Sequence, residues 1–295
     1  MGMNLAIMIL CHKNPNQIYR FIDSLSSNCI DFFIHIDKKS DIIIDRYKSN
    51  IFYIPNEKRI NVKWATFSQI QAELNLLKFA YDNDKKYDYY WLVSGQDYPI
   101  VSTDKILSEL SIDTSINYMN IVNSRNYGLD HNSGYDKRNE ICYPDWILKR
   151  NYTHKLLRHM WIKLTGGPTY TFSFFKRKES IKYKYYYGSQ WWCINRKFVE
   201  YVFEYINNNP EYLLAYNKSC CSDESFFQTL LMNSEYKNSR KDYLHYIDWN
   251  NNSNSPKTLT VNDLSKIIHS GKLMARKLDI LVDETLFNEL DKRRK

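Results

Sequence analysis

Apolar residues in the first hundred positions form short continuous runs, separated by stretches with helical periodicity. Runs of this length are typical of strands buried on both faces. The predicted strands are residues 4–11, 31–37, 51–54 and 87–94. Between them, apolar side chains recur at helical spacing after Pro15 and after Ser68, and a further helix is expected over residues 103–110. This alternation predicts an α/β fold with a mostly parallel central sheet flanked by helices.

The pattern weakens over residues 123–184, which are polar, basic and aromatic and predict loops with one or two helices. A strand is then expected over residues 188–195. Helices are expected over residues 196–206, 223–232, 261–269 and 283–290. No repeat or linker interrupts the chain, so we expect a single domain over residues 1–295 with a variable insertion at about 123–184.

Composition excludes several classes of protein. The chain has 43% hydrophobic and 25% charged residues, as in a globular domain, and its 16% aromatic residues exclude global disorder. The apolar run at residues 5–10 is too short to span a bilayer and lacks the flanks of a signal peptide. We therefore expect the chain to fold in the cytoplasm.

Cysteine usage and net charge further restrict the class of protein to which the chain can belong. The six cysteines form no Cys-x-x-Cys pair, and Cys11 and Cys193 lie in apolar runs, so free thiols are expected rather than disulfides or a zinc site. The net charge of +8 could attract phosphates, acidic sugars or an anionic membrane. No nucleic-acid-binding motif accompanies this charge.

Polar side chains gather where the predicted strands end. His12 follows the first strand, Asp37 ends the second, and Gln96 and Asp97 follow the fourth. Ligands of open parallel sheets bind at this edge, and mixed acids and bases suit a ligand such as a nucleotide sugar. The plainer interpretation is that charged residues follow strands because loops are solvated, and the residues alone leave both open.

The acidic pair Asp223-Glu224 precedes an apolar helical pattern. It is typical of a helix N-terminus, where the helix dipole favours acids. It is also a place where a carboxylate could face a pocket as a general base. Both interpretations can hold at once.

Trp191 and Trp192 are consecutive in a predicted strand, so they should point to opposite faces. One can pack in the core while the other flanks a ligand, and sugar rings stack well on aromatic faces. Core packing of both side chains remains the alternative.

The sequence Asp82-Asn83-Asp84 has the form of the D-x-D metal motif of many sugar transferases. We expect it not to bind metal, because it lies between a helix and a strand rather than after a strand. The corresponding strand end carries the single carboxylate of Asp97. Diphosphate charge would then be offset by basic side chains, unless these are simply solvated. The candidates are Lys257, Arg276 and Lys277.

Several sequence blocks together resemble the core-2/I-branching N-acetylglucosaminyltransferase family, which also holds the peptide-O-xylosyltransferases. The most specific block is Ser94-Gly95-Gln96-Asp97-Tyr98-Pro99-Ile100. The other blocks are His12-Lys13, Phe33-Ile34-His35-Ile36-Asp37-Lys38-Lys39, Trp64-Ala65-Thr66-Phe67-Ser68 with Ala72-Glu73-Leu74, Gly188-Ser189-Gln190-Trp191, Ser222-Asp223-Glu224, and Asp248-Trp249 with Ser255-Pro256 and Lys277.

The resemblance implies a GT-A fold and an inverting, metal-independent transfer of a GlcNAc- or xylose-type sugar from a UDP-sugar to a glycan hydroxyl. The family's general base falls on Glu224 and its diphosphate-binding lysine on Lys277. The arginine that accompanies this lysine has no clear match, and Lys257 is the nearest substitute. The other nucleotide-sugar positions are Ile9, His12, Asp37, Trp64, Gln69, Gln96, Asp97 and Arg276. The sugar or acceptor positions are Arg138, Gln190, Trp191, Asp223 and Trp249.

Animal members of this family carry a membrane anchor and lumenal disulfides, whereas this sequence resembles a bacterial cytoplasmic version. Such an enzyme would extend a glycan or lipid-linked saccharide for a surface polysaccharide. The acceptor would contact residues 123–184, and the basic surface would touch the inner face of the plasma membrane. No cofactor, divalent metal or nucleic acid is expected.

Two other classes stay open on the residues alone. A non-catalytic carbohydrate-binding protein would use the aromatic residues, bind oligosaccharide and ignore UDP. A nucleic-acid-binding protein would use the positive charge and bind with steep salt dependence.

Overall fold

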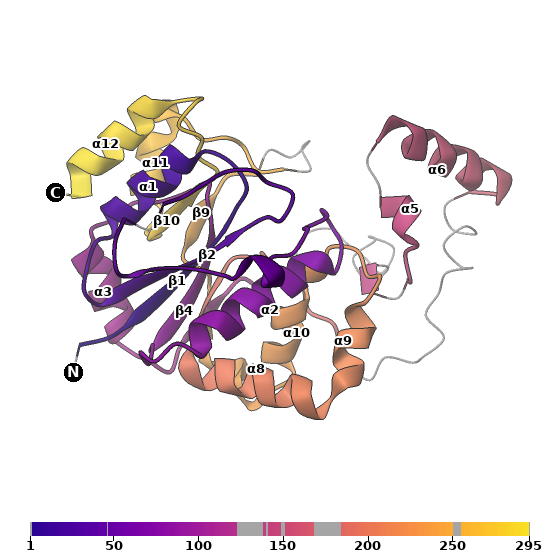
Figure 1. Cartoon of the computed structure of the whole chain (residues 1–295), viewed down its shortest axis with the longest axis horizontal. Helices are drawn as coiled ribbons and strands as arrows, with labels where there is room; N and C mark the ends of the chain where they lie inside the picture. Colours follow the sequence, from indigo (N-terminus) through magenta and orange to yellow (C-terminus); the bar gives the residue numbers. More distant parts are fainter. Residues whose placement is uncertain are drawn as a thin grey trace.

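The computed structural model describes residues 2–45, 47–122, 138–139, 141–148, 151–167, 184–249 and 255–294. Within this part of the chain the centre is a seven-stranded sheet (Figure 1). Its spatial order is β3 (Ile51–Tyr53), β2 (Ile30–Ile36), β1 (Leu5–Cys11), β4 (Tyr89–Ser94), β7 (Trp192–Asn195), β6 (Asn117–Met119) and β8 (Arg240–Lys241). The first four strands are parallel and β7 is antiparallel to its neighbours, which confirms the predicted mostly parallel sheet.

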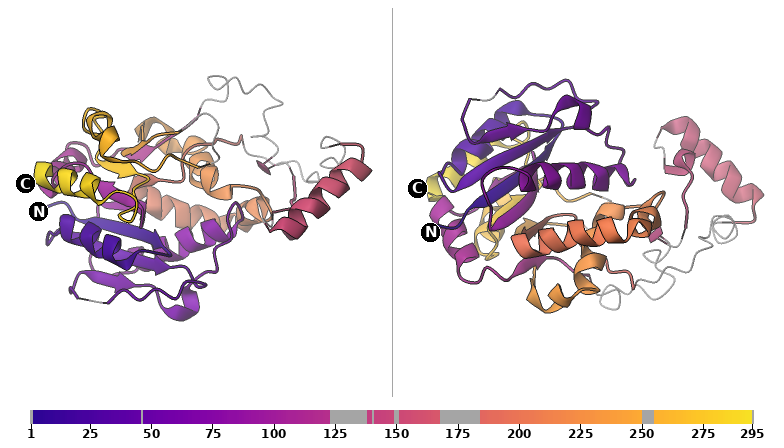
Figure 2. Two further views of the ribbon diagram at one scale, coloured as in Figure 1. Left: turned by 90° about the horizontal axis from the view of Figure 1, so that it is seen from above. Right: turned by 60° about the horizontal axis from the view of Figure 1, so that its bottom comes forward.

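Strand β1 shows how an apolar run serves two faces of a sheet, because successive side chains point in opposite directions. Leu5, Ile7 and Ile9 join one core cluster, and Ala6 and Met8 join the other. Helices α1 (Pro15–Ser24), α3 (Thr103–Ser111), α11 (Leu264–Ile268) and α12 (Glu284–Arg294) cover the first face. Helices α2 (Ser68–Tyr81), α8 (Arg196–Asn208), α9 (Pro210–Tyr216) and α10 (Phe226–Met232) cover the second (Figure 2).

A small second sheet connects the fourth strand end to the carboxyl-terminal part of the chain. Its order is β5 (Asp97–Pro99), β10 (Met274–Arg276) and β9 (His245–Ile247). The antiparallel pairing of β5 with β10 puts Asp97 opposite Arg276. The hydrophobic pattern did not predict this sheet, because three-residue strands show no periodicity.

Three expected elements are shorter than predicted, and one of them is the helix expected over residues 261–269, which is α-helical only in α11. The helix expected from residue 223 begins at Phe226, because the 3₁₀ turn η3 (Ser222–Glu224) precedes it and Ser225 breaks the helix with φ −140°. The strand expected from residue 188 begins at Trp192. Before it, the amide of Gly188 donates to the carbonyl of Glu224 over 2.8 Å instead of to a strand.

Further short turns and helices complete the described chain. They are η1 (Asn56–Lys58), η4 (Glu235–Ser239), η5 (Val261–Asp263), α5 (Asp145–Leu148) and α6 (Tyr152–Leu164). Helices α5 and α6 lie apart from the sheet and its flanking helices (Figures 1 and 2). They fall in the predicted insertion, most of which lies outside the described residues. All six cysteines are free, with Cys11 and Cys193 buried as expected.

Candidate active site

A cleft of about 240 Å³ opens at the carboxyl ends of β1, β2 and β4. The structure therefore gathers half of the predicted site residues at the edge where ligands of parallel sheets bind. The predicted residues that line it are His12, Asp37, Trp64, Gln69, Gln96, Gln190, Trp191 and Arg276.

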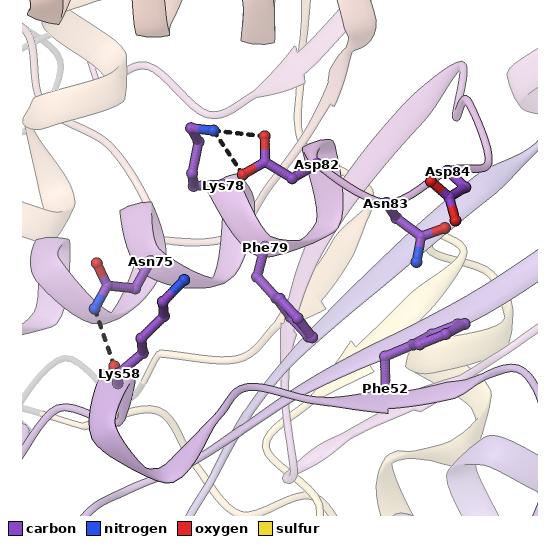
Figure 3. Close-up of a pocket in the computed structure, with 8 residues that line it drawn as sticks. All are labelled: Phe52, Lys58, Asn75, Lys78, Phe79, Asp82, Asn83 and Asp84. Carbon is purple, nitrogen blue, oxygen red and sulfur yellow. Dashed lines mark hydrogen bonds and ion pairs between the residues drawn. The ribbon is translucent and has the colours of Figure 1, made fainter.

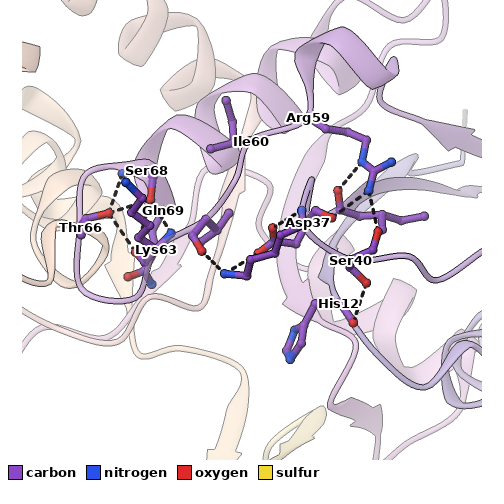
Figure 4. A network of polar contacts seen from close by, with 12 residues as sticks. His12, Asp37, Ser40, Arg59, Ile60, Lys63, Thr66, Ser68 and Gln69 are labelled. Atoms are coloured by element: carbon purple, nitrogen blue, oxygen red, sulfur yellow. Dashed lines mark hydrogen bonds and ion pairs between the residues drawn. The ribbon is translucent and has the colours of Figure 1, made fainter. Parts of the chain in front are cut away.

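The loop after β2 is held by an arginine that sequence analysis did not single out. Arg59 donates from Nε to the carbonyl of Ile36 and from Nη2 to that of Asp37, each over 2.8 Å, and also to the carbonyl of Ser40 over 3.1 Å (Figure 4). The amide of Asp37 donates to the carbonyl of Cys11 over 2.9 Å. These bonds fix Asp37 beside the end of β1.

Asp97 and Arg276 were predicted as separate candidates and form one unit in the structure. Arg276 donates from Nη1 to Asp97 Oδ1 over 3.0 Å and to the hydroxyl of Ser94. Its guanidinium lies 4.1 Å from the ring centre of Trp191. The Asp97 side chain is buried and does not line the cleft, so it acts on the cleft by holding Arg276.

Basic side chains converge on one side of the cleft. Lys13 lines it and pairs with Asp279 at 2.5 Å. Burial lowers the pKa of Lys277, and the positive charges of Arg276 and Lys13 lower it further. Burial and then the charge of Lys13 lower the pKa of His12 as well, against the opposing charge of Asp37. Such a concentration of positive charge suits a diphosphate.

The structure does not bring Lys257 into the cleft. Its Nζ lies 2.6 Å from Asp263 Oδ1, and it is not a lining residue. The arginine expected beside Lys277 has a better match in Arg276, which lines the cleft and precedes Lys277 directly. Two other predicted residues do not line the cleft. Ile9 is buried in the core, and Trp249 is 52% exposed elsewhere.

Glu224 lies next to the cleft in the turn η3. Arg138 Nη1 donates to Glu224 Oε2, and the Glu224 side chain is 32% exposed. A Cβ on Gly188 would lie 1.8 Å from the carbonyl oxygen of Asn120, so only glycine lets this backbone hold the carbonyl of Glu224.

Asp223 links this turn to the cleft wall. Gln69 Nε2 donates to Asp223 Oδ2 over 2.8 Å, and Gln69 Oε1 accepts from the amide of Ala65 over 2.5 Å. Ala65 has φ 61° and its carbonyl accepts from the amide of Cys221, which has φ 52°. Two non-glycine residues in the left-handed region indicate a backbone that the surrounding structure holds in place.

Glu73 is a buried carboxyl that sequence analysis quoted within a motif but did not assign to the site. It accepts from Gln190 Nε2 over 2.7 Å, so it orients a cleft-lining amide. Burial, and then the charge of Asp223, raise the pKa of Glu73 well above its usual value. A glutamate between Ile70 and Leu77 on the apolar side of a helix was the available signal.

The buried carboxyl of Asp223 gives a pH dependence of defined sign. Burial, and then the charge of Glu224, raise the pKa of Asp223 to about 8. The folded protein therefore binds a proton that the unfolded chain loses near pH 4, and the free energy of unfolding falls between about pH 4 and pH 8. Asp223→Asn removes this contribution, so its Tm should fall less than that of the wild type over this range.

Thermal unfolding of both proteins at several pH values checks this expectation. Asp242→Asn, at a carboxylate that pairs with Lys272 at the surface, is a control and should follow the wild type. Parallel curves for Asp223→Asn and the wild type would show that Asp223 titrates as an ordinary carboxylate.

The consecutive residues Trp191 and Trp192 lie in different environments. Trp191 lines the cleft and lies beneath Arg276. Trp192 packs on Phe227, with ring centres 4.6 Å apart. Trp191 therefore borders the cleft although it is only 7% exposed, whereas Trp192 does not line it.

The Asp82-Asn83-Asp84 sequence lies at the far end of α2 from Gln69, about 20 Å away by helix rise. It lines a separate surface cleft of about 510 Å³, where Asp82 pairs with Lys78 (Figure 3). Among the described residues no three His, Cys, Asp or Glu side chains are grouped to hold a metal ion. Nor do the described residues include a helix with the length and apolar character that crossing a bilayer requires.

Comparison with known proteins agrees with this geometry. Beta-glucuronosyltransferase GlcAT14A of Arabidopsis thaliana is 26% identical over 301 residues, covering 97% of this chain and 62% of that protein. Xylosyltransferase 1 of Homo sapiens is 23% identical over 317 residues, covering 98% of this chain and 30% of that protein. The chain thus spans less than two thirds of the length of these relatives. The family model described as Core-2/I-Branching enzyme matches residues 5–268. Because this match covers most of the sequence and confirms the resemblance, the chain belongs to the core-2/I-branching enzyme family.

Proposed function

We propose that the chain is an inverting glycosyltransferase that moves a sugar from a UDP-sugar to a hydroxyl of a glycan or lipid-linked saccharide. The observation that carries this proposal is that one carboxylate and several basic side chains lie around the same cleft. A partly exposed carboxylate, Glu224, is tied through Asp223 and Gln69 to one wall of the cleft. Lys13 and Arg276 line the same cleft, with Lys277 beside them.

This arrangement suits a single displacement. Glu224 takes the proton of the acceptor hydroxyl while the oxygen of that hydroxyl forms a bond to the anomeric carbon. The bond between that carbon and the β-phosphate oxygen breaks, and its electron pair leaves with UDP. Attack from the face opposite UDP inverts the configuration, so an α-linked donor gives a β-linked product.

Basic side chains carry the charge of the leaving group in this proposal. Arg276 and Lys277 face the negative charge that develops on the UDP leaving group. The buried carboxylate of Asp97 holds the guanidinium of Arg276 in place. Asp97 is the one carboxylate at the end of β4, and it is engaged by Arg276 rather than open to a divalent metal. We therefore propose transfer without a metal or other cofactor.

The donor is proposed to carry a GlcNAc- or xylose-type sugar. Relatives are named xylosyltransferase and beta-glucuronosyltransferase, so a glucuronosyl donor belongs in the same set of tests. Gln190 offers such a sugar an amide fixed by Glu73, and Trp191 borders the cleft behind Arg276. A bacterial surface polysaccharide is the proposed setting for the acceptor.

Substitution of Lys277 tests the nucleotide site. Lys277→Ala should weaken UDP binding by about tenfold or more, since a hydrogen bond to a charged group contributes about 1.5–3 kcal/mol. Uridine, which lacks the diphosphate, should bind nearly as before. Isothermal titration with UDP and with uridine measures both affinities.

Lys257→Ala is the matched control, because Lys257 pairs with Asp263 outside the cleft. It should leave UDP affinity unchanged. Equal losses of UDP and uridine binding in Lys277→Ala would contradict a diphosphate contact. Absence of UDP binding by the wild type would favour a carbohydrate-binding protein without catalysis.

A further inference from the structure

Helix α6 exposes an apolar face that is unusually large for a short helix. Among Tyr152, Leu156, Met160 and Leu164, the side chain with the lowest exposed fraction is Met160, at 50%, and Leu164 is 79% exposed. Isolated exposed leucines are common, but a contiguous apolar patch indicates an interaction surface. The exposed apolar residues of α6 are Tyr152, Leu156, Leu157, Met160, Trp161 and Leu164.

The charged residues of α6 are all basic. At 100° per residue, the exposed apolar residues fall on one half of the helix, with Tyr152, Leu156, Met160 and Leu164 in a single row four positions apart. The other residues of α6 are basic except for Thr153 and Ile162, and α6 contains no acidic residue. The basic residues are His154, Lys155, Arg158, His159 and Lys163.

The contact of α6 with its neighbour leaves this face open. Arg158 Nη1 donates to the carbonyl of Ile147 in α5 over 2.7 Å. The rings of Trp146 and Trp161 meet edge to face at 6.1 Å. The row through Leu156 and Met160 lies beyond these contacts and remains exposed.

We propose that α6 is an interfacial helix that binds the protein to an anionic lipid bilayer. An apolar face that carries Leu, Met and Trp, bordered by Lys and Arg, is the pattern of helices that lie in the plane of a membrane surface. Charge complementarity favours this occupant, because the exposed Lys155 and Lys163 lie beside one end of the apolar row and can pair with negative headgroups.

The place of α6 in the chain gives this contact a consequence that rests on the proposed function. Arg138, which holds Glu224, lies shortly before α5 and α6 in the sequence. The carbonyl of Arg138 also accepts from the amide of Cys220, two residues before the turn that carries Glu224. A bilayer bound to α6 would therefore approach from the side of Glu224, where a lipid-linked acceptor would enter.

Vesicle flotation of the full chain tests the proposal. The wild type should float with vesicles of phosphatidylcholine and phosphatidylglycerol and bind poorly to phosphatidylcholine alone. Leu156→Ser with Leu164→Ser should weaken binding by about tenfold or more. Lys155→Gln with Lys163→Gln should weaken it by about fivefold for each charge removed.

Matched controls lie elsewhere on the surface. Leu281→Ser changes a leucine that is 83% exposed, and Lys86→Gln changes an exposed lysine, both outside α6. Both should float like the wild type. Hydrolysis of a water-soluble UDP-sugar should be equal in all these variants, so loss of vesicle binding is separable from failure of the proposed activity.

Three results would overturn the proposal. The wild type could fail to bind the anionic vesicles, or the α6 variants could bind as tightly as the wild type. The third is a wild-type dimer in solution that Leu156→Ser with Leu164→Ser converts to a monomer without any vesicle binding. That outcome would assign the apolar face to a second copy of the chain.

Discussion

Glu224→Gln is expected to lower the rate of sugar transfer by about 10²–10⁴-fold, the usual loss when a positioned general base is removed. Glutamine has nearly the same shape and can still accept from Arg138, so the turn η3 should keep its structure. It cannot take a proton from the acceptor hydroxyl at neutral pH. The loss should therefore appear in kcat, while the affinity for UDP stays within about twofold because the proposed role of Glu224 is toward the acceptor hydroxyl.

The matched control is Glu235→Gln, at an exposed glutamate of η4. It should retain wild-type kcat and wild-type UDP affinity. Unchanged turnover in Glu224→Gln would remove Glu224 as the base. A loss of UDP binding together with turnover would indicate that the substitution disturbs the cleft.

Asp97→Ala is expected to have the largest effect on stability. The buried carboxylate accepts from the amide of Ser94 over 2.5 Å and from Arg276 Nη1 over 3.0 Å. Removing one partner of a buried ion pair costs about 3–5 kcal/mol, because the other charge is left uncompensated. For a chain of this length the Tm should fall by roughly 6–20 °C.

The same change should weaken UDP binding, because Arg276 loses the contact that fixes it over Trp191. Asp82→Ala is the control, since Asp82 pairs with Lys78 at the surface and such pairs contribute less than about 1 kcal/mol. Thermal unfolding and UDP titration of both variants make the comparison. Equal effects of the two substitutions would contradict the role given to the Asp97–Arg276 pair.

The first half of the fold could be predicted because it is built from local patterns. Strand β1 is a continuous apolar run, β2 and β4 are mostly apolar, and α1 shows its core-facing residues at helical spacing. Strand β10 could not be predicted in this way. It has three residues, and its pairing with β5 joins positions that are far apart in the chain.

Candidate residues such as His12, Asp37 and Gln96 were predictable by type and strand position, but the partners of the candidates were not. The contact between Asp97 and Arg276 spans 179 positions, and that between Arg138 and Glu224 spans 86. Local spacing carries no information on such contacts. For this reason Lys257 was the expected companion of Lys277, whereas the structure puts Arg276 in the cleft.

In the proposed sugar transfer, Glu224 and the basic side chains near one cleft act without a metal. UDP release from UDP-GlcNAc, UDP-xylose and UDP-glucuronic acid, measured with EDTA present, tests this mechanism. The wild type should hydrolyse one donor slowly in EDTA, and Glu224→Gln should abolish this release. Release that stops on addition of EDTA, or that persists in Glu224→Gln, would contradict it.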